Sequence, residues 1–518
     1  MTEKKSILQT LTERRHPDYV SMLPHWEFME ATYVGGRDWF LNNIFQYMKE
    51  GPTEYADRLE RAYRFNHTRE VVDLVNKYLF RGSVVRNEHD ASDALNGFWK
   101  KATLQGLDMT EFMKIVSTKS SIGGRPWVIV DNATGVIPEN ASQADTEKSN
   151  VYAYVVAPKD VLDMSYDSRG VLNWILIREY SRDDNDPLMD SGIVEERFRL
   201  WTRQDWILVG ETGPADSRRF EILDQGIHAL GEVPAVKVDN AITDDPWSCP
   251  ALITDVAYLD RATANYASNL DAIIQDQTFS QLAMPAQNVL PGDDAYNAIL
   301  DMGTKRIFLY DGEGGQAPQY LSPDPKQAAL IITAIQQLIN EIYHTVGLAG
   351  ERTKEDNSSG IDNSSGVAKA FDFERVTALL AQKADSLETA ENKIARLVSL
   401  WAGEDTPEED LITYSETFEM RGLQQELAIA LQLSAINVPE YMRSEQMKGV
   451  AEHLFPKLSA DQKKEMIEAI EKWEARLEET SAAELQNSKE SSAIVEESKR
   501  NRSNAGDKQS ATKSRDTD

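Results

Sequence analysis

The sequence predicts a mainly helical α+β protein, and three observations carry this prediction. Residues 367–402 contain neither Gly nor Pro and repeat apolar side chains every three or four positions. Residues 150–240 instead hold short β-branched and aromatic runs between Asp, Gly and Pro clusters. Two further helical stretches, within 241–280 and 324–348, flank a compact insert at 281–323.

The N-terminal part, residues 1–240, is expected to begin with helices. Tyr55, Leu59 and Ala62 mark one amphipathic run, and a second run ends before Gly82. A short helix is expected over 108–117. Short strands are then expected at Trp127–Val130, Val151–Val156, Trp174–Arg178, Glu195–Trp201, Trp206–Val209 and Val233–Val238.

The middle of the chain predicts a small lobe on a two-helix stalk. The first stalk helix should run from Pro250 to about Asp276, and the second should begin near Pro325. Between them the insert holds an apolar run at Leu282–Leu290 and a strand at Arg306–Tyr310. The first helix is supported by apolar and small side chains that alternate spacings of four and three: Leu252, Val256, Leu259, Thr263, Tyr266, Leu270 and Ile273.

The long helix within 367–425 carries the clearest periodicity in the chain. At ~1.5 Å per residue it would span roughly 54 Å, which exceeds what one small core needs and indicates a strut. Lys383 interrupts the apolar stripe, which argues against a simple, uniformly apolar coiled coil. The stripe consists of Phe373, Val376, Leu380, Lys383, Leu387, Ala390, Ile394, Leu397 and Trp401.

Three segments follow this helix. Leu411–Phe418 is expected to return as a strand, and residues 426–478 are expected to be helical with a break at Val438-Pro439. Residues 479–518 are rich in Ser, Asn, Lys and Glu, so we expect a disordered tail.

Residues 349–366 join the second stalk helix to the long helix, and they contain a doubled polar tetrad. Asn357-Ser358-Ser359-Gly360 is followed by Asn363-Ser364-Ser365-Gly366, and Arg352 and Lys354 are the only cations. A segment of this composition has too few apolar side chains to form a core, and its Gly and Ser residues leave the backbone mobile. On these residues alone, an ordinary surface loop is as good an interpretation as a functional one. Ser364 or Ser365 suits the N-cap of the long helix.

Composition excludes several classes of protein. The chain of 518 residues predicts about three domains, and no window resembles a signal peptide or a transmembrane span. A single cysteine, Cys249, excludes an internal disulfide framework and predicts a small packed residue. The net charge of −30 argues against a sequence-independent duplex-DNA clamp. It suits a passage through which DNA slides, and simple solubility explains the charge equally well.

The sequence predicts neither catalysis nor a cofactor or metal. It lacks a GxxxxGK[ST] loop, a GxSxG elbow and an HExxH pair. His16 and His25 are expected to pack or to cap a helix. The acidic run Asp183–Asp186 resembles a calcium loop only loosely, because Met189 stands where such a loop needs glycine, and a solvated hairpin tip is the better interpretation.

The order of these parts, up to about residue 478, resembles the portal proteins of tailed bacteriophages. Three segments carry the resemblance: Tyr55–Arg69 with Val71-Val72 and Tyr78-Leu79-Phe80, the β region ending at Leu230–Val236, and the helix–insert–helix–loop–helix series with Ser364-Ser365-Gly366-Val367-Ala368. Each segment alone is weak evidence for the resemblance, and their order along the chain is the stronger evidence.

The resemblance implies a portal-like fold and a ring of subunits, most often twelve, at one vertex of the capsid. It assigns residues 1–240 and 367–425 to the wing, helices within 241–280 and 324–348 to the stem, and 281–323 to the clip. The crown would be 426–478. The tunnel loop, 349–366, would face DNA with Arg352, Lys354, Asn357, Ser358, Ser359, Asn363, Ser364 and Ser365.

The family also implies the partners of such a ring. These are double-stranded DNA in the channel, the large subunit of the terminase, the major capsid protein and a head-completion or adaptor protein, with no membrane. The ring would be assembled in the host cytoplasm and retained in the virion. Two other classes stay open: another virion structural or adaptor protein with long helical struts, or a metal-dependent nuclease built from dispersed carboxylates.

We expect the C-terminal tail to be dispensable for assembly, because residues beyond Thr480 lack the apolar area that would offset the entropy of ordering. Truncation after Thr480 should leave the yield of rings unchanged in native mass spectrometry. Loss of rings in the truncated protein would show that the tail has a structural role.

Overall fold

The computed structural model describes residues 7–82, 84–132, 151–184, 186, 188, 192–213, 218–278, 281–285, 294, 307–310, 319–321, 325–348, 366–415, 418, 448, 466–470 and 472. The chain forms two compact units, Met1–Phe418 and Glu419–Asp518. In the second unit the described residues are helical, and most of the helical region predicted over 426–478 lies outside them. The predicted tail, 479–518, lies wholly outside them.

Helices fill the N-terminal part of the first unit, as predicted. Side chains cap several of them: Asp108 accepts from the Glu111 amide at 2.8 Å, and Asn66 accepts from the Arg69 amide at 3.0 Å. The helix predicted over 108–117 extends to Gly123. The helices are α1 Ile7–Thr12, α2 Pro17–Val34, α3 Arg37–Asn43, α4 Pro52–Arg61, α5 His67–Leu79, α6 Asp93–Lys100 and α7 Met109–Gly123.

Two antiparallel sheets follow. In the first, β2 (Trp127–Asn132) lies between β3 (Val151–Val156) and β9 (Ala235–Lys237). The second is a five-stranded meander with the order β4-β5-β6-β7-β8. Its strands are β4 Val161–Tyr166, β5 Leu172–Arg182, β6 Val194–Thr202, β7 Asp205–Thr212 and β8 Arg219–Ile227.

The predicted strands are confirmed, but the prediction omitted β4 and β8. β8 is an edge strand with exposed residues along most of its length, so burial imposes no alternation on its sequence. β4 contains Asp163 and Ser165, which interrupt its apolar run. The His16 amide donates a hydrogen bond to the Leu162 carbonyl of this strand.

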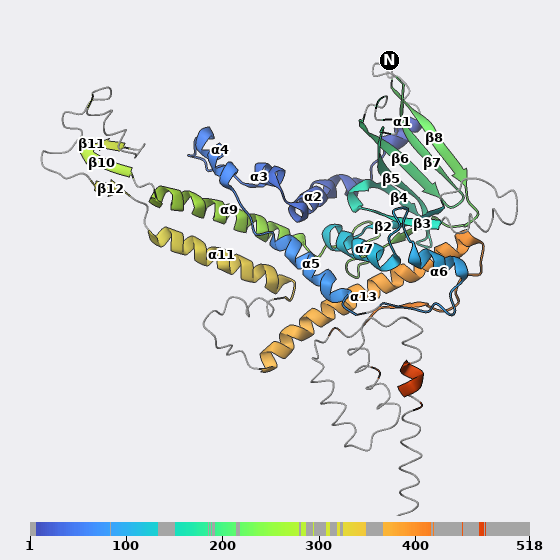
Figure 1. The fold of residues 1–518 in the computed structure, drawn as a ribbon. Coiled ribbons are helices and arrows are strands. Elements are labelled where there is room, and N and C mark those ends of the chain that lie inside the picture. Colours follow the sequence, from blue (N-terminus) through green and yellow to red (C-terminus); the bar gives the residue numbers. More distant parts are fainter. Residues whose placement is uncertain are drawn as a thin grey trace, which may run out of the picture. The chain divides into compact units, whose positions relative to one another are not determined.

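The stalk and lobe predicted from the sequence are present as secondary structure. Helix α9 (Thr254–Thr278) packs along α11 (Pro325–Thr345), and a small sheet lies beyond the ends of both (Figure 1). In that sheet β10 (Gln281–Pro285) pairs in parallel with β11 (Ile307–Tyr310) and antiparallel with β12 (Gln319–Leu321). Helix α9 begins four residues later than predicted.

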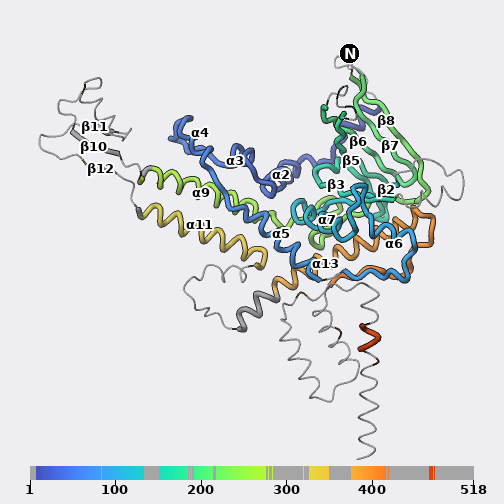
Figure 2. The backbone as a smooth tube through the Cα atoms, viewed as in Figure 1, coloured from blue at the N-terminus to red at the C-terminus, as the bar shows by residue number. Residues whose placement is uncertain are grey.

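Helix α13 (Gly366–Ala402) agrees with the predicted long helix and passes beside α5, α6 and β2 (Figure 2). Leu380, Leu387, Ile394 and Leu397 are buried in the larger of two main apolar cores. The second core lies between the five-stranded sheet and α1–α2.

The strand predicted at Leu411–Phe418 is shorter over the residues that the structure describes, which exclude 416 and 417. Among those described, β13 (Ile412–Thr413) alone forms a ladder, with β1 (Val85–Arg86). The ladder ends at Tyr414 because the Tyr414 amide donates to the Glu388 carboxylate of α13 at 2.8 Å.

Gly124 closes the turn after α7, and its position tolerates no side chain. Its φ is +86°, and a Cβ there would lie 1.8 Å from the Cys249 carbonyl oxygen. We expect Gly124→Ala to destabilise the protein by about 3 kcal/mol or more in chemical denaturation.

Gly170 is a matched control, because its φ is +77° and its surroundings are open. Gly170→Ala should cost only the left-handed backbone strain, about 1–2 kcal/mol. Equal costs at the two positions would contradict the close approach of Gly124 to Cys249.

Candidate functional site

The residues predicted to face DNA lie outside the described part of the chain. Their location relative to a channel therefore stays a prediction. The structure describes the two flanks of the segment, which are α11 with its following turn and α13. The eight residues are Arg352, Lys354, Asn357, Ser358, Ser359, Asn363, Ser364 and Ser365.

The upstream flank is fixed in the core. Ile342, Tyr343, Val346 and Leu348 are buried at the end of α11. The Tyr343 hydroxyl donates to Glu70 of α5. After α11, the chain turns through Gly347, whose φ is +75°, and the Leu348 amide donates to the Tyr343 carbonyl at 2.7 Å. These contacts hold the point where residues 349–365 begin.

The downstream flank of the segment is the start of α13, which lies several residues before the point where α13 contacts the end of α11. A Cβ on Gly347 would lie 3.5 Å from the Arg375 Cβ, nine positions after the start of α13 at Gly366. At ~1.5 Å per residue, the start of α13 lies roughly 14 Å along the helix axis from that contact. Residues 349–365 could reach roughly 56 Å if extended, at ~3.3 Å each. The connection is therefore much longer than the offset between its two ends requires.

Lys383 holds the middle of α13 in place. Its side chain is fully buried in the predicted stripe, and its Nζ donates to Asn240 Oδ1 at 2.7 Å. Asn240 in turn donates from Nδ2 to the Pro250 carbonyl at 3.0 Å and from its backbone amide to the Gly124 carbonyl at 2.8 Å. Burial lowers the pKa of Lys383 to about 7.

The C-terminal third of α13 has a second buried polar anchor. Glu391 accepts from Arg86 Nε and from the Tyr414 hydroxyl, each at 2.6 Å. Burial raises the pKa of the Glu391 carboxyl, and Arg86 opposes that rise. Asn392 binds the amides of Leu411 and Ile412 at 3.0 and 3.1 Å. The register of α13 against β1 and β13 is thus fixed by polar contacts.

Helix α9 is tied to the N-terminal helices in the same way. Asp260 is fully buried and accepts from the Thr68 amide at 3.0 Å and the Thr68 hydroxyl at 2.7 Å. Arg58 of α4 is held by Glu50 at 2.7 Å and donates to Ser268 of α9 at 2.9 Å. Both helices that carry the small sheet are therefore supported by the core, α9 through α4–α5 and α11 through α5.

The residues that the sequence assigned to packing are confirmed in that role. His16 caps α2 by accepting from the Asp18 amide at 3.2 Å, and its ring stacks on Trp247 at 4.0 Å. Cys249 is buried, and burial raises the pKa of its thiol. Arg182 pairs with Val194, so the acidic run after Arg182 lies in the β5–β6 hairpin connection, as predicted.

Within the described residues, no three His, Cys, Asp or Glu side chains lie close enough together to hold a metal ion. None of the helices described is both long and apolar enough to cross a membrane.

Comparisons with known proteins found matches among solved structures alone. No protein-family model matches the chain, and the search of curated proteins gave no match.

Three of the similar structures come from gene transfer agent (GTA) particles. A chain of the virion of the native particle is 11% identical, with a TM-score of 0.41, over 77% of this chain and 94% of that one. A chain from the neck of the empty particle, computed with C6 symmetry, is 10% identical, with a TM-score of 0.42, over 74% and 89%. A chain from the neck of the native particle, computed with C12 symmetry, is 10% identical, with a TM-score of 0.41, over 80% and 98%.

The buried amine of Lys383 predicts a pH dependence of stability. Its pKa is about 7 in the folded protein and 10.5 as its ordinary value, so between these pH values the unfolded chain binds a proton that the folded chain does not. The free energy of unfolding should therefore rise with pH in this window, by up to about 1.4 kcal/mol per pH unit from this group.

Lys383→Met should remove that contribution, because it keeps the apolar contacts of the stripe without a titrating group. Urea denaturation at several values between about pH 7.5 and 9.5 measures the difference in slope between the two proteins. Identical slopes would mean that the Lys383 amine stays protonated in the folded state.

Proposed function

We propose that this protein is the subunit of a portal ring in a tailed phage or phage-like particle, where it forms the channel for DNA packaging and ejection. One observation carries the proposal: α9, the β10–β12 sheet, α11, residues 349–365 and α13 follow one another in this order. A paired stalk bears a small lobe at its far end, and the chain then returns through a polar segment to a long helix in the core.

Each part receives a role in this proposal. Residues 1–240 and 367–425 form the wing, and α9 and α11 form the stem. The small sheet, within 281–323, forms the clip that docks the packaging motor and later the head-completion protein. Residues 426–478 form the crown, and the capsid protein surrounds the ring. Residues 349–366 form the tunnel loop.

The anchors of α11 and α13 support the assignment of the tunnel loop. A segment that touches moving DNA needs firm attachment at both ends and enough length between them. Tyr343 and Leu348 fix one end, and α13 is fixed by Lys383 and Glu391. Short polar side chains with two cations give weak, salt-sensitive contacts with phosphates. The net charge of −30 disfavours adhesion of the duplex elsewhere.

Ring formation is the other requirement of the proposal. The stem exposes apolar side chains that a single copy leaves in water: Leu330 is 71% exposed, Ile274 45% and Ile332 44%. Head-to-tail contacts between identical subunits close into a ring when the rotation between neighbours allows it. We expect a closed ring, most often of twelve subunits in the family that the sequence resembles.

Removal of Asn357 through Asp362 tests the role of the loop. The shortened protein should still form rings, because Tyr343, Leu348, Lys383 and Glu391, which hold α11 and α13 in the core, lie outside the removed segment. Packaging or retention of DNA should fall, because the loop no longer reaches the duplex. Electron microscopy scores the rings, and the amount of DNA per capsid scores the packaging.

A control replaces the same six positions, Asn357 through Asp362, with Gly and Ser, which keeps the length and changes the composition. Normal packaging by this control would show that packaging depends on the length of the loop and not on the composition of these six positions. Normal genome filling by the shortened protein would reject the channel assignment. Loss of its rings would place the loop at a subunit interface.

A further inference from the structure

The outward side of α11 lacks charge over most of its length. Residues 327–340 contain no Asp, Glu, Lys or Arg, in a chain of which 27% is charged. One side of the helix packs on α9, and the opposite side exposes Ala329, Leu330, Ile332 and Thr333. We call these four residues the α11 face. Charged residues are depleted in the centres of protein interfaces, so an exposed helix face of this kind is typical of one that a partner covers.

A second uncharged surface lies between α3 and α4. Residues 41–48 contain no charged residue either. Leu41 is 54% exposed, Phe45 57%, Tyr47 62% and Met48 90%. We call these four residues the α3–α4 patch. Such a concentration of exposed aromatic and Met side chains is characteristic of binding surfaces.

The α3–α4 patch is held rigidly on α9. The Phe45 amide donates to Asn265 Oδ1 at 2.9 Å, and Arg58 donates to the Phe45 carbonyl at 2.8 Å. The Tyr47 amide donates to Glu50 at 3.1 Å, and the Tyr55 hydroxyl donates to the Ile44 carbonyl at 2.7 Å. A surface that is ordered before binding loses little conformational entropy when a partner docks.

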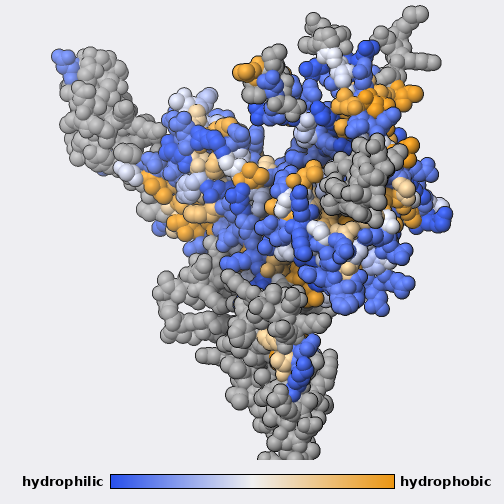
Figure 3. Space-filling view, turned by 45° about the vertical axis from the view of Figure 1, so that its right-hand side comes forward, coloured by the Kyte–Doolittle hydropathy of each residue, from blue (hydrophilic) through white to orange (hydrophobic). Residues whose placement is uncertain are grey.

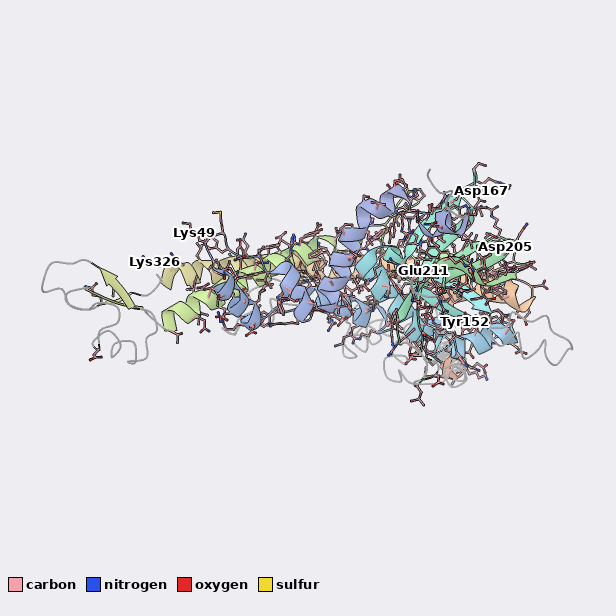
Figure 4. The ribbon with its side chains drawn as sticks, turned by 90° about the horizontal axis from the view of Figure 1, so that it is seen from above. Lys49, Tyr152, Asp167, Asp205, Glu211 and Lys326 are labelled. Atoms are coloured by element: carbon pink, nitrogen blue, oxygen red, sulfur yellow. The ribbon has the colours of Figure 1, made fainter. Side chains whose placement is uncertain are left out.

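The two surfaces lie on opposite sides of α9. Figure 1 shows α9 as a middle layer, with α3 and α4 on one side and α11 on the other, and α4 and α11 each contact α9. Lys49 follows the patch and Lys326 is the second residue of α11, and Figure 4 shows both lysines at the same end of the helix pair. Figure 3 shows hydrophobic residues on the helical stalk as well as at the other end of the molecule. The surfaces therefore share a level along the stalk but cannot meet within one chain.

We propose that the α3–α4 patch of one copy docks on the α11 face of the next copy, and that this contact repeats around the ring. The inference rests on the proposed function, because it names the surfaces that join the subunits. The contact is head-to-tail, since the two surfaces differ and face away from each other. Exposed charges border both surfaces: Glu54, Asp57 and Glu60 of α4 and Lys49 lie beside the patch, and Lys326 lies in the first turn of α11. The net negative border of the patch favours pairing with the α11 face over a contact between two patches.

Two single substitutions test the pairing: Met48→Glu on the patch and Leu330→Glu on the α11 face. Both side chains are largely exposed, so each variant should keep its fold, as circular dichroism and thermal unfolding will show. Each alone should form no rings, with association weakened at least tenfold, because the substitution buries a carboxylate in the contact. Ile227→Glu is the matched control: Ile227 is 91% exposed on β8, and its substitution should leave the rings intact.

Mixing the two variants gives the decisive result. Met48→Glu chains keep an intact α11 face, and Leu330→Glu chains keep an intact patch, so the mixture should form one-to-one dimers that cannot extend. Native mass spectrometry of isotope-labelled partners identifies these dimers. The double variant Met48→Lys with Leu330→Glu should recover rings, because opposite charges then meet in the contact.

Three results would overturn the inference. Rings formed by either single variant would show that the named surface is not required, and the portal proposal would stand. A mixture that stays monomeric would show that the two surfaces do not pair with each other. Wild-type protein that never assembles would remove the proposed function, and this inference with it.

Discussion

The structure depends on the burial of α13, whose buried side includes two ionisable side chains. Lys383 and Glu391 are both buried, and each is satisfied by partners far away in the sequence, Asn240 and Arg86. A buried polar group without its partner costs more free energy than a lost apolar contact, so a shift of α13 by one turn would leave several such groups unpaired. We infer that these contacts specify the register of α13, and that the apolar residues around them supply most of the stability.

The same logic extends to α9, where Asp260 and Arg58 tie the helix to α4 and α5. Two long helices locked to one core can carry parts that lie outside it: the small sheet at the end of the α9–α11 pair, and the segment that links α11 to α13. Charged side chains are distributed unevenly between α9 and α11. Asp260 and Asp271 of α9 form ion pairs with Arg64 and Arg61, whereas residues 327–340 of α11 contain no charged side chain. A portal subunit needs this division between a rigid support and surfaces reserved for its neighbours and for DNA.

The long helices were predictable because a 3.6-residue period over twenty or more positions outweighs local exceptions. The series of helix, lobe, helix and helix therefore followed from the sequence. The edge strand β8 did not, because a strand exposed along most of its length carries no alternation. Over the described residues, the strand after α13 is shorter than predicted, because the Tyr414 amide donates to the Glu388 carboxylate.

The supports of the candidate site were only partly visible in the sequence. Lys383 stood out as a charged residue within an apolar stripe. Asp260 and Glu391 are also charged residues among apolar helix positions, but they were not predicted to be buried. Their partners could not be predicted, because Arg86 and Glu391 meet only through the tertiary fold. The eight residues predicted to face DNA keep that status, since the described residues include only the flanks of their segment.

The central claim is that copies of this chain close into a ring around a channel. Electron microscopy of the purified full-length protein, with the subunits of each particle counted, tests it most directly. The account predicts closed rings of one predominant size with an open centre. Monomers at micromolar concentration and near-physiological salt, or open filaments without closure, would contradict it.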